Sequence, residues 1–514
     1  MHGLDLMLHG PLVRTFLRYC IPWTLAMLLQ SSAAIVDGFF VGRYVGAMSL
    51  AALNLVMPMF SLFFGVGVML ASGGAVRAGK YLGEKRPEAA SAIFTKTMLS
   101  LLLVGLAASA GMLLFSGELV RFLGADEELR GPAEAYLRGL MFFGPMIPCG
   151  LALSYFVRVN GKPALASVGL MLSALINIVL DAVFIPVFGM GVEGAAYATG
   201  IAYTITTGVL CLHFFTPEAK CRFTRAIGAW KEVGQACWNG VSELINETSI
   251  GLVILFINWI LLARIGSYGV AAFTIINYAA WFGASVSYAI SDSLSPLVSA
   301  NFGARNFARA RQFLGLALGM VFGIGLMLYA LFALYPEMLL KIFLPGEEKV
   351  VAVTLEFIDW FKLAFLFSGL NMALASFFTA LHMAAASAAV ALMRSLLFPV
   401  GFLWLLPQLF GNVGIYVAIP LAEMCTLVVA SLIFAASRNI LPIVRRTTAR
   451  SGRHGAEKIC SGGLCGRNAV EHGVAAVARQ PVVSYAMRPD KLVLKRTLLV
   501  MLHGCSLNRV TEKR

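Results

Sequence analysis

The chain has 514 residues, of which 59% are hydrophobic and 13% are charged, and its mean hydropathy is +0.81. Soluble domains carry about 25% charged residues, so these values exclude a water-soluble fold of this size. The formal net charge is +14, and we interpret this excess as membrane topology and contact with anionic lipids rather than as binding of nucleic acid.

Apolar stretches of about twenty residues recur along the chain, and each is long enough to cross a hydrocarbon core of about 30 Å as a helix. Lipid offers no partner to free backbone groups, so unbroken stretches of this kind favour helices over barrel strands. The sequence therefore predicts an all-α integral membrane protein with twelve transmembrane helices. The expected spans are 12–38, 48–76, 91–116, 136–160, 163–188, 191–215, 234–263, 270–300, 311–335, 354–381, 384–409 and 412–437.

The loops between these spans alternate in charge. Basic residues gather in alternate loops, at 77–86, 158–162, 220–231 and 305–311, whereas the loop at 118–134 is acidic. The positive-inside rule places the basic loops in the cytoplasm. Both termini are then cytoplasmic, which requires an even number of spans and agrees with twelve.

An internal repeat divides the chain into two related halves. Three stretches recur in order at a nearly constant offset of 220–222 residues: 41–56 matches 262–277, 80–90 matches 301–310, and 154–170 matches 376–392. Gly46 thereby pairs with Gly266, and Gly83 pairs with Gly303. Six helices in each half make two pseudo-symmetric six-helix bundles related about the membrane normal, the arrangement whose rocking supports alternating access.

The repeat sets the expected domain boundaries. Residues 1–215 form an N-terminal six-helix lobe, 216–233 a cytoplasmic linker between lobes, 234–440 a C-terminal six-helix lobe, and 441–514 a basic tail. Because the tail is rich in Arg, Gly and Ser, we expect it to be disordered.

Ionisable side chains inside a transmembrane helix cost a few kcal/mol each, so each one is a candidate for function. Asp37 follows an apolar run with Gln30 two turns earlier, and Asn177 and Asp181 share one face of their helix. Such oxygens can bind a hard cation or hold a proton, and we expect them to couple ion to substrate. The alternative is that each aspartate caps a broken helix or binds backbone at a kink.

Further acidic residues occur in the second half. Glu243 and Glu247 are spaced i, i+4 early in the 234–263 span, and they indicate either a second cation or substrate site or a wet helix end. Asp292 lies near the cytoplasmic end of the next span, where we expect a helix-end or gate contact.

The remaining buried or isolated polar residues favour structural roles. Arg394 is a cation inside a predicted helix and needs a carboxylate partner, for which Glu423 and Asp359 are the candidates. His382 stands in a loop on the basic side, where we expect a surface histidine. The sequence contains no nucleophile–histidine arrangement, Walker loop or HExxH motif, so we expect no enzymatic activity.

Four stretches resemble the multidrug and toxic-compound extrusion (MATE) family. They are DGFFVGRYVGAMSLAALNL (37–55), GKYLGEKRPEAA (79–90), NIVLDAVFIPVFGMGVEGAAYATG (177–200) and SPLVSANFGARNFARARQ (295–312). The resemblance covers roughly residues 10–440. The stretch from Asn246 to Asn258 is similar to the bacterial branch of multidrug exporters.

The resemblance implies two six-helix bundles facing a central cleft, with export driven by inward movement of H⁺ or Na⁺. The family's first-lobe cation site maps onto Asp37, Asn177, Asp181 and Thr199, with Gln30 beside it. Na⁺ is the one metal ion expected at this set. In the second lobe the substrate-cavity candidates are Glu243, Glu247 and Asn258. The positions that match Asp37 and Asp181 there are Ile257 and Leu403, so we expect ion coupling in the first lobe.

The predicted function is secondary active multidrug efflux, in which amphipathic or cationic organic compounds are exchanged for H⁺ or Na⁺ by alternating access. We expect a monomer in the plasma (inner) membrane whose partners are lipid and small molecules, without a cofactor or nucleic acid. One alternative is a flippase for lipid-linked saccharides, which is disfavoured because Arg394 is nearly alone as a cavity arginine. A non-transporting membrane scaffold is the other, but it would not need Asp37 and Asp181 in the membrane.

Overall fold

The computed structural model describes residues 3–336 and 348–438, and within these ranges the chain is helical and contains no strand. One compact unit extends to Val428 and contains the packing described below, while the last helix continues to Arg438. The tail expected at 441–514 lies outside the described residues.

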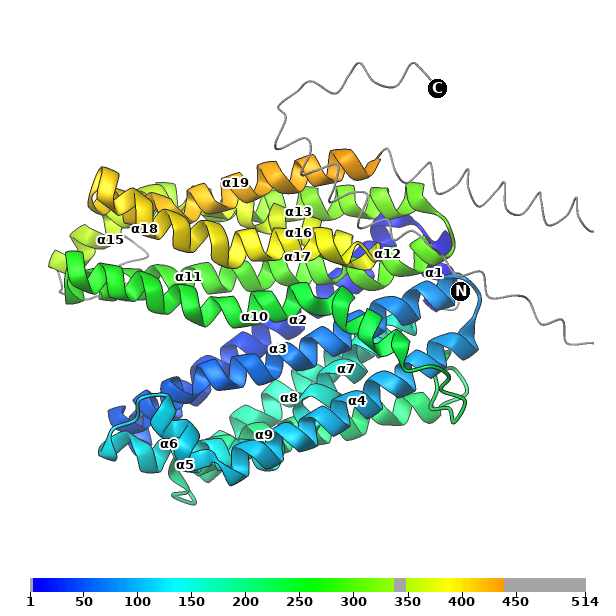
Figure 1. Cartoon of the computed structure of the whole chain (residues 1–514), viewed down its shortest axis with the longest axis horizontal. Coiled ribbons are helices and arrows are strands. Elements are labelled where there is room, and N and C mark those ends of the chain that lie inside the picture. Colours follow the sequence, from blue (N-terminus) through cyan, green and yellow to red (C-terminus); the bar gives the residue numbers. More distant parts are fainter. Residues whose placement is uncertain (1–2, 337–347, 439–514) are drawn as a thin grey trace, which may run out of the picture. The chain divides into compact units, whose positions relative to one another are not determined.

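The first half of the chain folds into long helices joined by short turns (Figure 1). Its elements are α1 (Gly3–His9), α2 (Leu12–Phe40), the π-helical turn η1 (Val41–Val45), α3 (Ala47–Gly83), α4 (Pro87–Leu114), α5 (Ser116–Phe122), α6 (Glu127–Phe142), α7 (Met146–Val159), α8 (Pro163–Phe184), α9 (Gly191–Leu212) and the short 3₁₀ turn η2 (His213–Phe215).

The second half repeats this plan. Its elements are α10 (Lys231–Arg264), α11 (Ser267–Asp292), α12 (Leu294–Gly303), α13 (Phe307–Leu334), α15 (Glu348–Phe361), α16 (Ala364–Ala380), α17 (Ala384–Leu392), the π-helical turn η3 (Met393–Leu397), α18 (Phe398–Phe410) and α19 (Asn412–Arg438).

The predicted spans are all occupied by helix. Nine helices within the described ranges are long and apolar enough to cross a membrane, and α6 with α7, bent by 48°, makes a tenth. The expected spans 270–300 and 354–381 are each divided between two helices, α11 with α12 and α15 with α16. The all-α membrane fold predicted from the sequence is confirmed.

One kind of turn joins consecutive helices at four places. The backbone enters the left-handed region at Lys85, Gly161, Arg305 and His382, with φ of 60°, 88°, 59° and 61°. At each place the N–H of this residue bonds the carbonyl three residues back, and the next N–H bonds the carbonyl five back, as in a Schellman cap. The predicted repeat is therefore confirmed, and the turn also recurs within each half.

The prediction of a surface position for His382 is wrong. Its ring lies 5.7 Å from that of Phe302, and its Nε2 is buried without a partner among the described residues. Burial, together with the nearby charges of Lys80 and Arg77, holds the pKa of His382 well below its usual range. The imidazole is therefore neutral at physiological pH, and its side chain fills space beneath the turn.

The linker at 216–233 packs along α4. The Arg222 and Thr224 N–H groups donate to hydroxyls of Ser91 and Thr95 on that helix, both at 3.1 Å. Lys96, which is almost fully buried, donates to Glu232 at the start of α10 at 2.6 Å. These bonds attach the entry of the second half to the first half.

The two halves approach each other closely where α3 crosses α12. A methyl group on Gly83 would lie 2.0 Å from the carbonyl oxygen of Ala300, and one on Gly303 would lie 2.0 Å from the carbonyl oxygen of Lys80. Small residues let two helices pack backbone against backbone. The glycines that the sequence repeat pairs therefore form one reciprocal contact between the halves.

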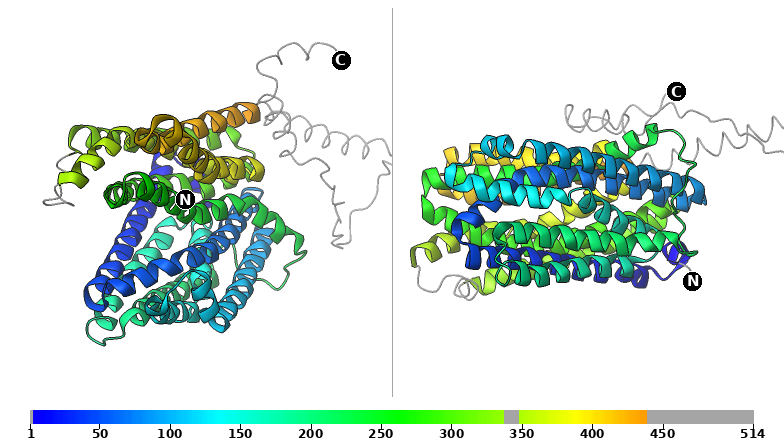
Figure 2. Two further views of the ribbon diagram at one scale, coloured as in Figure 1. Left: turned by 60° about the vertical axis from the view of Figure 1, so that its left-hand side comes forward. Right: turned by 90° about the horizontal axis from the view of Figure 1, so that it is seen from below.

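A second close crossing joins α3 to α10, which run side by side in the middle of the unit (Figures 1 and 2). A methyl group on Gly73 would lie 2.0 Å from the carbonyl oxygen of Ala236, and one on Gly240 would lie 2.0 Å from that of Met69. With the α12 crossing, this contact holds the halves together at the end of the unit that carries the four repeated turns.

The second half contains a buried ion pair. Arg394, in η3, donates from Nε to Glu423 Oε1 at 3.1 Å, and Asn371 Nδ2 donates to Oε2 of the same carboxylate at 2.7 Å. The expected carboxylate partner of Arg394 is therefore Glu423. The other candidate, Asp359, pairs instead with Lys362.

We predict that Gly83→Ala and Gly303→Ala each lower the free energy of unfolding of the detergent-purified protein by about 1–3 kcal/mol, because the added methyl group separates the crossing backbones. The double variant should cost less than the sum, since both glycines form one contact. Residual folded protein after heating, followed by size-exclusion chromatography, measures this. Gly319→Ala is the control, because that glycine has open space around it; equal losses in all three single variants would contradict the prediction.

Arg394→Met should destabilise the protein by about 3 kcal/mol, because it leaves the Glu423 carboxylate buried without its cation. Adding Glu423→Gln should recover much of the loss, since an amide does not need a positive partner. The same heating assay applies, with Lys362→Met as the control: its partner Asp359 is 70% exposed, and such pairs contribute little. A double variant no more stable than Arg394→Met would refute this account.

Candidate functional site

Two aspartates of the first half lie close together inside the helix bundle. Asp37 is on α2 and Asp181 on α8, and these helices pack against each other. Asp181 is fully buried, and neither of its carboxylate oxygens, nor Oδ1 of Asp37, has a hydrogen-bond partner among the described residues. The charges of the two carboxylates interact with each other and with the Tyr136 hydroxyl from α6. The aspartates thus form a pair without a built-in cation in this part of the structure.

An amide and a hydroxyl adjoin this acid pair. Asn177 Nδ2 donates to Thr199 Oγ1 at 3.2 Å, which links α8 to α9. Asn177 is one helical turn before Asp181, on the same face of α8. The structure therefore brings together the four residues that the family resemblance assigned to a cation site. Gln30 lies about 10 Å from Asp37 along the α2 axis.

The backbone beside the acid pair is not regular α-helix. One turn after Asp37 the chain passes into η1, and it ends at Gly46, whose φ is 118°. Turns of this wider kind occur frequently at functional sites. In the sequence repeat, the counterpart of Gly46 in the second half is Gly266. The N–H group of each glycine bonds the carbonyl five residues back. The break is shared by the halves, but the acids are not.

A second acidic group lies on the second half, where it faces the first. Tyr288 donates to Glu243 Oε2 at 3.3 Å, and the charge of Glu243 interacts with those of Asp292 and Glu247. Glu247 packs beside Gly65 of α3. These glutamates are half-buried in the course of α10, so the alternative of a wet helix end does not describe them.

Asn258 does not join these glutamates. It lies on α10 about 22 Å along the axis from Glu243, and its Oδ1 is buried without a partner among the described residues. The structure thus separates the three cavity candidates of the second half into a glutamate pair and a distant amide.

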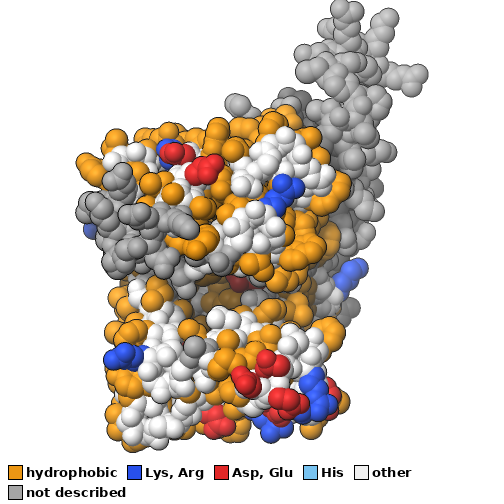
Figure 3. All heavy atoms as spheres, turned by 90° about the vertical axis from the view of Figure 1, so that its left-hand side faces the viewer, with side chains coloured by type: hydrophobic (Ala, Val, Ile, Leu, Met, Phe, Trp, Pro, Cys, Tyr) orange, Lys and Arg blue, Asp and Glu red, His pale blue; other side chains and the backbone are white. Residues whose placement is uncertain are grey.

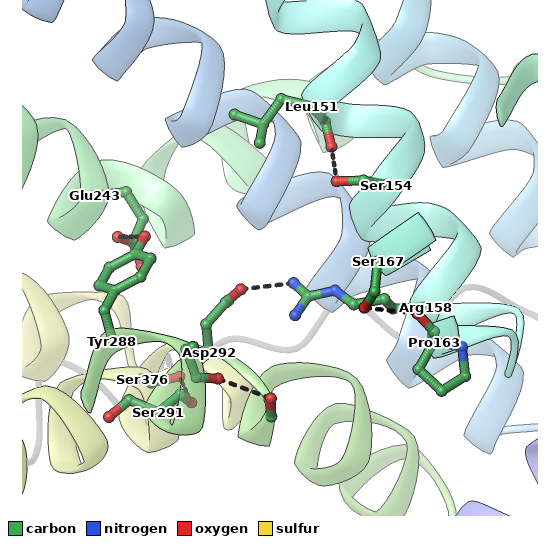
Figure 4. Close-up of polar contacts among 12 residues, drawn as sticks. Leu151, Ser154, Arg158, Pro163, Ser167, Glu243, Tyr288, Ser291, Asp292 and Ser376 are labelled. Carbon is green, nitrogen blue, oxygen red and sulfur yellow. Dashed lines mark hydrogen bonds and ion pairs between the residues drawn. The ribbon is translucent and has the colours of Figure 1, made fainter. Parts of the chain in front are cut away.

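Arg158, predicted to lie in the basic loop at 158–162, is instead buried within the last turn of α7. The side chain is 1% exposed, and its Nη2 donates to Asp292 Oδ2 at 2.7 Å, across the boundary between the halves (Figure 4). Asp292, for which we expected a helix-end or gate contact, forms an ion pair between the two halves. The apolar run that precedes Arg158 in α7 was the available signal for a buried cation, because it carries the helix into the core before the turn begins.

At the end of the long helices that lies away from the four repeated turns, the surface of the unit is hollowed between the halves (Figure 3). The close crossings and the Arg158–Asp292 pair lie near the repeated turns, at the other end of the long helices. Among the described residues, no three His, Cys, Asp or Glu side chains cluster as a metal site would require. The groups available here are paired carboxylates with neighbouring amide and hydroxyl oxygens.

Sequence comparisons agree with this geometry. The MatE family matches the chain twice, at residues 22–183 and 244–405. The chain is 25% identical to the probable multidrug resistance protein YoeA of Bacillus subtilis over 348 residues, covering 65% of this chain and 74% of YoeA. It is 22% identical to the multidrug export protein MepA of Staphylococcus aureus over 445 residues, covering 84% of this chain and 96% of MepA.

Solved structures share the fold. An outward-facing multidrug resistance MATE family transporter of the MOP superfamily has a TM-score of 0.80 at 22% identity, over 86% of this chain and 99% of that one. A MOP superfamily transporter from Pyrococcus furiosus also has a TM-score of 0.80 at 22% identity, over 87% and 99%. The two family matches together cover more than half of the sequence and follow its repeat, and the chain belongs to the MatE family.

Proposed function

We propose that this protein is a secondary active multidrug exporter that exchanges amphipathic or cationic organic compounds for H⁺ or Na⁺ by alternating access. The observation that carries the proposal is the Asp37–Asp181 pair, whose buried oxygens lack hydrogen-bond partners in the described structure. The relatives YoeA and MepA are named for multidrug resistance and multidrug export, which supports the substrate class.

Two neighbouring carboxylates without a cation are costly inside a membrane, where each charge costs a few kcal/mol. A proton or a Na⁺ ion removes this cost, and the Asn177–Thr199 pair supplies further oxygen ligands one turn away. The acid pair lies within the first half, among α2, α6 and α8, whereas Glu243 and Glu247 face the boundary between the halves. Separate positions for ion and substrate are compatible with exchange, because occupancy of one site can change the arrangement around the other.

The end of the unit with the basic loops is closed and the opposite face is hollowed (Figure 3). If the basic loops face the cytoplasm, as the positive-inside rule states, this form is open to the outside. We place the protein as a monomer in the plasma (inner) membrane, with both termini in the cytoplasm. Release of substrate to the outside and capture of the coupling ion from there would then occur in this form.

A flippase for lipid-linked saccharides is the weaker candidate. Such a cavity needs cations that are free to bind diphosphate. In the described structure Arg158 is buried and Arg394 is half-buried within the helices. Each of them is already bonded to a carboxylate, Asp292 and Glu423 respectively. The acid-rich boundary between the halves favours cationic substrates over anionic ones.

In proteoliposomes that contain the purified protein, an imposed H⁺ or Na⁺ gradient should drive efflux of a fluorescent organic cation such as ethidium. Asp37→Asn and Asp181→Asn should reduce the gradient-driven rate to that of protein-free liposomes, because an amide cannot take up or release a proton and binds Na⁺ weakly. The initial efflux rate with each ion gradient measures this and identifies the coupling ion.

The matched control is Glu128→Gln, which removes an exposed acid of the same half, and it should keep full activity. Gradient-driven efflux at the unmodified rate in both aspartate variants would overturn ion coupling at this pair. Absence of efflux by the unmodified protein under either gradient would overturn the exchanger itself.

A further inference from the structure

Arg158 is a cation of the first half that is paired with an acid of the second half. Its guanidinium lies 3.8 Å from the ring of Trp23 on α2 and 4.6 Å from that of Tyr155 on α7. Both rings belong to the first half and attract a cation to their faces. Arg158 is therefore fixed to the first half by stacking, while its one ion pair reaches Asp292 on the second half at 2.7 Å.

Further acids of the second half lie near Asp292. Asp292 is one turn after Tyr288, which donates to Glu243 Oε2 (Figure 4), and the Glu243 carboxyl interacts electrostatically with those of Asp292 and Glu247. Glu243 and Glu247 come from α10 and Asp292 from α11, and the guanidinium reaches Asp292 from α7. Two nitrogens of Arg158, Nε and Nη1, are buried without a partner among the described residues, so the guanidinium is not tightly enclosed by fixed acceptors.

Separation of the halves at this end would break the ion pair in a defined way. The stacking contacts keep Arg158 with the first half, and the acids stay with the second. Asp292, Glu243 and Glu247 would then face the opened space without a cation, and buried carboxylates without a partner attract any cation that can enter. When the halves close again, the guanidinium returns to the same acids.

We propose that Arg158 is a tethered competitor of the transported organic cation: it occupies Asp292 in the closed form and yields this carboxylate to the substrate when the halves separate. This inference rests on the proposed export function and assigns Asp292 as the acid that a cationic substrate takes over from the guanidinium. Closure and release of the substrate are then one event, because the returning arginine displaces the bound cation.

The affinity of the detergent-purified protein for ethidium tests this competition without an ion gradient. Arg158→Met removes the competitor but keeps the length of the side chain, so ethidium should bind about tenfold more tightly, as measured by fluorescence anisotropy. Asp292→Asn removes part of the acidic group and should weaken binding. Arg158→Lys keeps the charge and should bind as the unmodified protein does. The neutral dye Nile red should bind all four proteins equally.

The control is Arg138→Met, which breaks an ion pair with Glu134 inside the first half and should leave ethidium affinity unchanged. If Arg158→Met does not fold, the exchange Arg158→Asp with Asp292→Arg preserves an ion pair but removes the acid from the second half. Ethidium should bind this exchanged protein more weakly than the unmodified one.

Unchanged or weaker ethidium binding by folded Arg158→Met, equally tightened binding of Nile red, or unmodified affinity in the exchanged protein would each overturn the proposal. These outcomes are separate from failure of the exchanger. If efflux depends on Asp37 and Asp181 but Arg158→Met has unchanged affinity for ethidium, only the competition by Arg158 is refuted. If Arg158→Met binds ethidium more tightly but no gradient drives efflux, the competition is supported and ion coupling is refuted.

Discussion

A charge buried away from water needs a partner, and this protein meets that constraint in three different ways. Arg394 and Glu423 satisfy each other permanently within the second half. Arg158 and Asp292 satisfy each other only while the two halves are in contact. Asp37 and Asp181 keep carboxylate oxygens without partners among the described residues. The three cases run from a fixed bond, through a bond that depends on conformation, to a pair of acids whose buried oxygens have no partner in the described structure.

The contacts between the halves bear on how the Arg158–Asp292 ion pair can break. At the α3–α12 and α3–α10 crossings the helices pack backbone against backbone through glycines. Arg77 and Tyr81 of α3 also bond Gln235 and Glu232 of α10. Packed elements can shift against each other as rigid bodies. The buried ion pair of Arg158 then provides specificity that the glycine surfaces lack, because it favours one arrangement of the halves.

The two halves share the features that set the path of the backbone but differ in their buried acids. Both keep the break at Gly46 and Gly266 and the Schellman turns at the helix ends, since these set the path of the backbone. Ile257 and Leu403, the counterparts of Asp37 and Asp181, are fully buried apolar residues in the core of the second half. At these positions that half has no equivalent acid pair, and one of its buried acids, Glu423, is paired with Arg394 of the same half.

The sequence by itself determined the membrane fold, the helical spans, the repeat and the residues of the first acid group. These follow from local properties: apolar length, the sign of loop charges, and i, i+4 spacing along one helix. The tertiary structure alone decided which charges meet across helices that are far apart in sequence. Arg158, which the sequence places in a basic loop, lies at the boundary between the halves and pairs with Asp292, 134 positions away. The tertiary structure also half-buried His382 against the ring of Phe302. A single helix fixes the direction of each side chain, but only packing between helices fixes what that side chain faces.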